Sequence, residues 1–136
     1  MKMTKVLIIG RGGREHALGW SISQDPKVDE VLYAPGNAGT QEGKCRNVPI
    51  DGTKKENFPN LTEIVEKESI DHIVVGPEQP LVDGIVDFFN TLGYTNIFGP
   101  DSKGSVIEAN KLYSHILMKE CKIPQADSII CFLCKE

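Results

Sequence analysis

Four short runs of apolar, largely β-branched residues, each followed by a glycine turn, dominate the hydrophobic pattern of the chain. They cover residues 6–9, 31–34, 73–75 and 97–98. Because these runs are continuous rather than alternating, they predict strands that are covered on both faces, as in parallel sheets. One weaker strand is predicted at 48–50.

Amphipathic helices are predicted between the strands. The first begins at Arg14 or Glu15 and turns Leu18 and Ile22 towards the core. Strands that alternate with helices are connected by right-handed crossovers and form an open sheet. The expected fold class is therefore α/β, with a Rossmann-like, open, mostly parallel sheet.

Two further helices are predicted, one after the second strand and one after the third. One is expected over about 60–68, with Asn60 and Glu63 as a reciprocal capping pair. The other has Pro80 in its first turn and ends at Gly93.

In the last part of the chain, the hydrophobic pattern predicts one long helix and one more strand. The helix covers about 102–122, with Ser105 and Glu108 as a capping box. The apolar run at 128–133 is typical of a strand, and it lies close to the last residue.

Length and charge narrow the function classes. The 136 residues suit a single domain with little left over, and the formal net charge of −4 disfavours a large basic surface for nucleic acid or anionic lipid. The apolar run at 6–9 is too short for a signal peptide or a membrane span, so we expect a cytoplasmic protein without a membrane partner. The four cysteines are expected to be free thiols.

The first glycine turn is the main candidate for binding chemistry. Gly10, Gly12 and Gly13, with Arg14 and Glu15, join the first strand to the first helix. Glycines permit close backbone approach, and the N–H groups at a helix start attract anions, so phosphate is the expected guest. A tight turn without a ligand is the alternative.

This turn differs from the dinucleotide fingerprint G-x-G-x-x-G. Glu15 stands at the third glycine position, and no carboxylate follows the second strand to read a ribose. The spacing also excludes a P-loop. Nicotinamide cofactors are therefore disfavoured.

Two other turns lie at the same expected edge of the sheet. Asn37, in the turn after the second strand, offers an amide to a sugar, although the turn alone is ordinary. Gly76, Pro77 and Glu78 follow the third strand, where Glu78 either favours a helix start or accepts from a ribose hydroxyl or an amine. We expect no catalytic or metal-binding residue, since the histidines show no ligand spacing and the C-x-x-C at 131–134 has no second pair.

Together these motifs resemble the N-terminal region of the phosphoribosylamine–glycine ligase family, also called glycinamide ribonucleotide synthetases. The resemblance rests on five stretches in the same order and extends to about Ala126; they are 6–18, 34–40, 74–81, 98–100, and Glu108 with Lys111 before 123–124. Arg11 stands where many relatives carry a small polar residue.

The resemblance implies an ATP-grasp ligase of purine biosynthesis. In the family, ATP with Mg²⁺ or Mn²⁺ activates the carboxylate of glycine, and the amine of 5-phosphoribosylamine attacks it to give glycinamide ribonucleotide. It implies phosphoribosyl substrate binding at Gly10, Gly12, Gly13, Arg14, Glu15, Asn37, Gly76, Pro77 and Glu78, and ATP binding near Lys111.

The resemblance also implies a division of the chain. Residues 1–101 are expected to form the substrate-binding domain, and 102–136 the truncated start of an ATP-grasp domain without the metal carboxylates. No cofactor is then expected to be held by this chain alone, which is expected to be inactive, and its partner is the remainder of a longer or fused purine-pathway polypeptide. An isolated binding or regulatory module and a fragment of a nucleotide-cofactor oxidoreductase remain as alternatives.

Overall fold

The core of the molecule is an open sheet in which every pair of neighbouring strands is parallel. A computed structural model describes residues 3–129. The sheet has five strands in the order β3-β2-β1-β4-β5. This confirms the expected α/β class with an open parallel sheet. The strands are β1 (Thr4–Gly10), β2 (Val28–Pro35), β3 (Cys45–Asn47), β4 (His72–Val75) and β5 (Ile97–Phe98).

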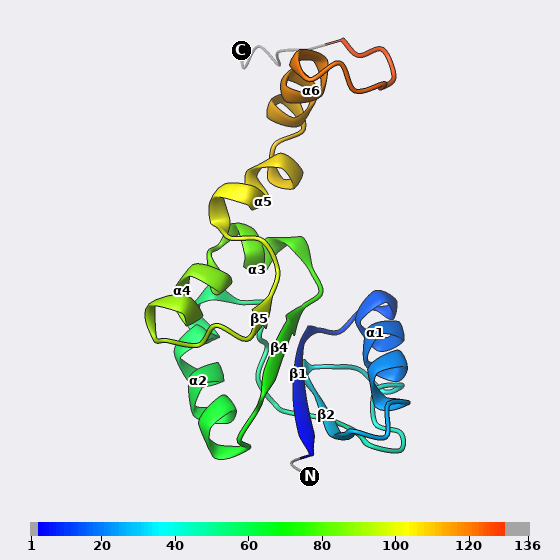
Figure 1. The fold of residues 1–136 in the computed structure, drawn as a ribbon, viewed down its shortest axis with the longest axis vertical. Coiled ribbons are helices and arrows are strands. Elements are labelled where there is room, and N and C mark those ends of the chain that lie inside the picture. The colour runs from blue at the N-terminus through cyan, green and yellow to red at the C-terminus, as the bar shows by residue number, and fades with distance from the viewer. Residues whose placement is uncertain (1–2, 130–136) are drawn as a thin grey trace, which may run out of the picture.

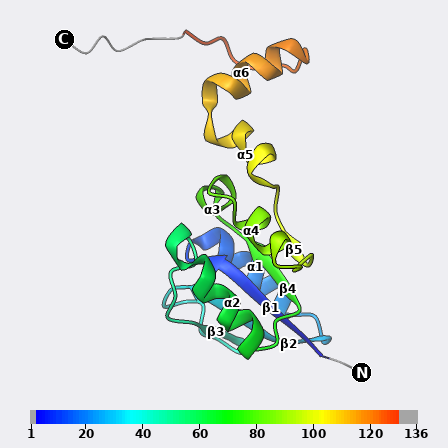
Figure 2. The same ribbon diagram turned by 90° about the vertical axis from the view of Figure 1, so that its left-hand side faces the viewer.

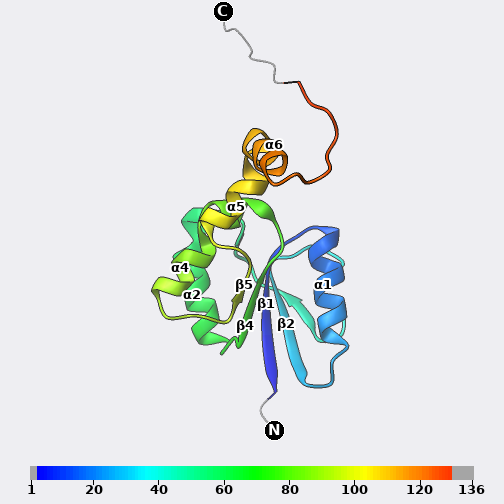
Figure 3. The ribbon, with the colours of Figure 1, turned by 45° about the horizontal axis from the view of Figure 1, so that its top comes forward.

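Helices cover both faces of this sheet (Figures 1 and 3). Helix α1 lies on one face over a small core of β1 and β2 side chains, while α2 and α4 lie on the other face over the larger core. The helices are α1 (Gly13–Ser23), α2 (Phe58–Lys67), α3 (Glu78–Val82), α4 (Ile85–Thr91), α5 (Ser102–Ala109) and α6 (Lys111–Glu120), with a 3₁₀ turn at Lys55–Asn57.

The face that α1 turns to the sheet differs from the expectation. Leu18 is 39% exposed, and the buried positions of α1 are Glu15 and Gly19. A Cβ atom at Gly19 would lie 1.8 Å from the Tyr33 hydroxyl oxygen. A glycine is therefore needed for α1 to lie over the buried Tyr33 ring, and this close approach turns Leu18 outwards.

The third expected helix is two helices. Gly84, with a φ of +86°, separates α3 from α4. Only glycine adopts this left-handed conformation without strain. Helix α4 ends at Thr91, before Gly93 as expected, and Leu92 between them is exposed.

The capping pairs expected for the other helices are wrong. Helix α2 begins at Phe58, two residues before Asn60, with Pro59 in its first turn. The long C-terminal helix is also divided, because Asn110 has an extended conformation. Asp101 caps α5 by accepting from the N–H of Gly104, and Asn110 caps α6 by accepting from the N–H of Tyr113.

Two strand expectations also change. The strand expected at 48–50 lies earlier, at β3, and Val48 follows it as a buried core residue. Ser128 and Ile129 have no strand structure, and residues 130–133 of that expected strand lie outside the described residues.

Helices α5 and α6 extend away from the sheet (Figures 1 and 2). Helix α5 packs on α3 and α4 and contacts α6. Three large apolar side chains of α6, Leu112, Tyr113 and Ile116, are 40–47% exposed. The boundary expected at 101/102 coincides with the start of α5 and stays a prediction. Among the described residues, no helix combines the length and apolar character needed to cross a membrane.

Candidate functional site

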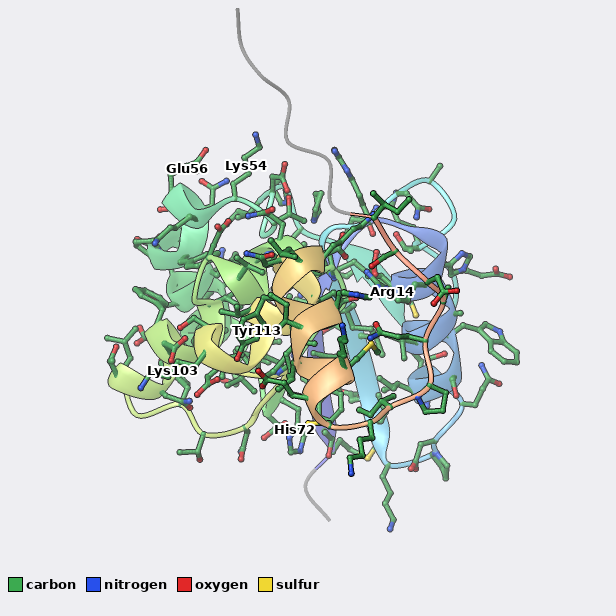
Figure 4. The ribbon with its side chains drawn as sticks, turned by 90° about the horizontal axis from the view of Figure 1, so that it is seen from above. Arg14, Lys54, Glu56, His72, Lys103 and Tyr113 are labelled. Carbon is green, nitrogen blue, oxygen red and sulfur yellow. The ribbon has the colours of Figure 1, made fainter. Side chains whose placement is uncertain are left out.

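A cavity of about 570 Å³ lies where β1 and β4 end, and this size is typical of small-molecule sites. In an open parallel sheet, ligands bind at this carboxyl edge. Figure 4 looks down on this side of the molecule, where Arg14 points inwards from the start of α1. The lining residues are Arg11, Gly12, Glu15, Asp51, Thr53, Lys54, Lys55, Glu56, Pro77, Gln79, Pro80 and Asp83.

The carboxylate of Glu15 occupies a niche whose walls are glycines. A Cβ atom would lie 2.6 Å from a Glu15 side-chain atom at Gly10, 2.8 Å at Gly12 and 2.3 Å at Gly76. Such separations are too short for real carbon contacts. The glycines of two separate turns therefore make room for a side chain of the protein itself.

Both carboxylate oxygens of Glu15 accept hydrogen bonds inside this niche. The N–H of Gly12 donates to Oε2 at 2.6 Å, and Nε of Arg14 donates to Oε1 at 3.0 Å. Glu15 is only 4% exposed. An internal anion therefore already uses the Gly12 N–H, one of the donors that the sequence pattern assigns to a phosphate.

Arg14 links Glu15 to the second glycine turn. Its Nη2 donates to Oε2 of Glu78 at 3.4 Å, and the two side chains are 56% and 55% exposed. The hydrogen bond to Glu15 raises the pKa of Arg14, with a smaller contribution from Glu78. The pKa of Glu78 is lowered, first by its own backbone N–H and then by Arg14. A charged pair therefore lies in solvent beside the cavity.

Asn37 is fixed by its neighbours. Its Nδ2 donates to the carbonyl of Arg11 at 2.7 Å, and its Oδ1 accepts from the N–H of Gly39 at 2.7 Å. The buried Thr40 hydroxyl accepts from the N–H of Asn37 at 2.7 Å and donates to Oδ1 of Asn47 at 2.6 Å. In this arrangement Asn37 ties its turn to the first glycine turn.

The sequence pattern misses the residues that follow β3. Asp51, Lys54 and Lys55 line the cavity beside Arg11. Hydrogen bonds from Thr53 lower the pKa of Asp51, and the positive charges of Arg11 and Lys54 add to this effect. An Asp-Gly-Thr turn was the available signal, because the Asp51 carboxylate accepts from the Thr53 N–H and hydroxyl.

Lys111 lies apart from this cavity. It is exposed on α6 and lines a separate hollow of about 590 Å³ with Glu108, Leu112 and His115. Within residues 3–129, no three His, Cys, Asp or Glu side chains are grouped to hold a metal ion. Cys45 and Cys121 are free thiols, as expected, whereas the C-x-x-C motif at 131–134 lies outside the described residues.

The structure thus groups most of the expected residues at one edge. Gly12, Glu15 and Pro77 line the cavity, while Arg14 and Glu78 pair beside it. Gly10 and Gly76 form walls of the Glu15 niche. Gly13 is open, since a Cβ atom there would meet no atom within 4 Å.

Comparison with known sequences identifies one protein family and relatives of one name. The family described as "Phosphoribosylglycinamide synthetase, N domain" matches residues 4–108. Phosphoribosylamine–glycine ligase of Pseudomonas putida is 46% identical over 124 residues, which are 90% of this chain and 28% of that protein. The enzymes of the same name from Xanthomonas campestris and Escherichia coli K12 are 47% and 45% identical, again over 90% of this chain and 28% of theirs.

Proposed function

The chain belongs to the phosphoribosylglycinamide synthetase N-domain family, and from this premise we propose that it binds the phosphoribosyl substrate of a phosphoribosylamine–glycine ligase. The proposed site is the cavity at the ends of β1 and β4. The observation that carries the proposal is that this cavity joins the two glycine turns of the family motif. The chain spans about 28% of the length of the relatives it matches, so the ligase activity of the whole family enzyme is part of the proposal.

The ligand contacts follow from the groups that remain accessible. Glu15 takes the N–H of Gly12, so the phosphate is left with the next N–H groups of the first turn of α1 and with the positive charge of Arg11. Glu78, exposed beside the cavity, can accept from a ribose hydroxyl or from the amine of 5-phosphoribosylamine. Asn37 holds the neighbouring turn in place.

We propose that ATP and glycine are the other substrates of the ligase reaction. Bound ATP supplies the phosphoryl group that activates the carboxylate of glycine for attack by the amine. Lys111, exposed on α6, is proposed to approach ATP in a longer ligase chain. Within residues 3–129 no three acidic, histidine or cysteine side chains are grouped for Mg²⁺ or Mn²⁺, so we propose that the metal ion binds with ATP in the remainder of such a ligase. We also propose that the protein works in the cytoplasm, together with the remainder of such a ligase.

Calorimetric titration with glycinamide ribonucleotide tests the proposal. We expect saturable binding by the chain and weaker binding by Gly12→Val, because a Cβ atom at Gly12 would lie 2.8 Å from Oε2 of Glu15 and disturb the turn. Glu68→Gln is the control, because Glu68 pairs with Arg46 away from the cavity. Absent binding by the wild-type chain, or equal affinities for Gly12→Val and wild type, would contradict the proposed site.

A further inference from the structure

We propose that Glu15 is a positioning residue, which holds Arg14 at the cavity so that the guanidinium exchanges Glu78 for the phosphate of the ligand. This inference rests on the proposed function, because it names the contacts of the same site. Of these two neighbouring residues, Arg14 contacts the ligand and Glu15 holds Arg14 in place.

Glu15 contributes to the cavity wall, but its side chain is only 4% exposed and each of its oxygens already accepts a hydrogen bond. Its side chain is enclosed by Gly10, Gly12 and Gly76, and its two oxygens accept from Gly12 and Arg14. Removing a buried carboxylate from such donors would cost more than a single ligand contact returns. Glu15 therefore acts through the group that it holds.

The two ends of Arg14 are held very differently. Nε donates to a buried carboxylate at 3.0 Å, whereas Nη2 reaches the exposed Glu78 carboxylate at only 3.4 Å. Exposed ion pairs contribute little to stability because water competes for both groups. The outer edge of the guanidinium is thus free to leave Glu78 while Nε stays fixed.

A planar guanidinium fixed at one nitrogen suits a phosphate. Its remaining N–H groups match two phosphate oxygens, and a fixed side chain loses less conformational freedom on binding than a mobile one. When Arg14 turns to the phosphate, the Glu78 carboxylate loses its partner. It then becomes available to accept from the sugar hydroxyls or the amine.

The first arm of the test examines the free protein. In a ¹⁵N spectrum of arginine Nε–H groups, we expect an Arg14 signal that is displaced from those of solvated arginines and exchanges slowly with water. Glu15→Gln keeps the shape of the side chain but removes the negative charge and leaves one acceptor oxygen for two donors, the Gly12 N–H and Arg14 Nε. The charge-assisted hydrogen bond to Arg14 is lost in either orientation of the amide, so the signal should shift towards that of solvated arginines. Glu68→Gln is the matched control, because Glu68 pairs with Arg46 away from the cavity.

The second arm measures the affinity for glycinamide ribonucleotide. Glu15→Gln is expected to bind about tenfold more weakly, since charge-assisted hydrogen bonds have this magnitude. Arg14→Lys keeps the positive charge at an exposed position and should also bind more weakly, because lysine cannot hold Glu15 and a phosphate together. Glu68→Gln should bind like wild type.

Each result has a distinct meaning. A solvated Arg14 signal in the wild-type protein, or one unchanged by Glu15→Gln, overturns the proposal without any ligand. Unchanged affinity in Glu15→Gln overturns it as well, even if the signal moves. A wild-type chain that binds no glycinamide ribonucleotide contradicts the proposed function, and the anchoring of Arg14 is then judged by the spectrum alone.

Discussion

Substitution of Gly76 by alanine tests whether two turns, far apart in the sequence, are joined through Glu15. A Cβ atom at Gly76 would lie 2.3 Å from Cγ and 2.4 Å from Oε1 of Glu15. The φ angle of Gly76 lies outside the left-handed region, so alanine introduces a steric conflict without backbone strain. The expected effect is displacement of the Glu15 carboxylate.

The magnitude follows from the contacts that are lost. The hydrogen bond from the Gly12 N–H to a buried carboxylate is worth about 2 kcal/mol, and the contact with the half-exposed Arg14 is worth about 1 kcal/mol. We therefore expect the free energy of unfolding to fall by about 3 kcal/mol, which is also the scale of an overpacked site. Urea denaturation followed by circular dichroism measures this change.

A double-mutant cycle identifies the conflicting side chain. In a Glu15→Ala background the space is open, and Gly76→Ala should then cost less than about 1 kcal/mol. Gly13→Ala, whose Cβ atom would meet nothing, controls for the loss of a glycine in the first turn. The reasoning fails if Gly76→Ala costs the same with and without the Glu15 carboxylate.

Three further predictions concern packing, pH and activity. Gly19→Ala should destabilise the fold by about 3 kcal/mol in urea denaturation, because its Cβ atom would lie 1.8 Å from the Tyr33 hydroxyl, and a neutral effect would contradict the packing of α1. Arg46→Met, which removes the ion pairs with Glu30 and Glu68, should cost about 1–2 kcal/mol at neutral pH. Because Arg46 lowers the pKa of Glu30, this cost should disappear as the pH falls below 4.5 through the folded-state pKa, and a cost independent of pH would be the contrary result. Given ATP, Mg²⁺, glycine and phosphoribosylamine, the chain should show no glycine-dependent ADP release in a coupled assay, and release abolished by Lys111→Ala would refute this.

The strands and the carboxyl edge of the sheet could be predicted from local sequence, because a continuous β-branched run that ends in glycine is typical of a buried strand followed by a turn. This pattern alone predicts that the turns at Gly10 and Gly76 lie on the same side of the sheet. The burial of Glu15 did not follow, because it depends on the pairing of β1 with β4 across more than sixty residues. From the sequence alone the glycines indicate a ligand, whereas in the fold they enclose a side chain.

The helix errors have local physical causes. Apolar spacing alone assigned Leu18 to the core, but the bulk of Tyr33 selected Gly19 as the contact. The helices break at Gly84, where glycine favours a left-handed conformation, and at Asn110, where asparagine favours a helix N-cap. Both residue types indicated a break, but the regular apolar spacing across them predicted continuous helices. The cavity residues after β3 were missed because that segment has no regular period.

Amide chemical shifts during titration with glycinamide ribonucleotide test the central claim most directly, because they report where on the chain the ligand binds. The account predicts saturable shifts centred on the N–H groups of Gly12–Glu15 and Gly76–Glu78, at the ends of β1 and β4. Shifts centred on α6, or none at saturating ligand, would contradict a phosphoribosyl site at this edge of the sheet.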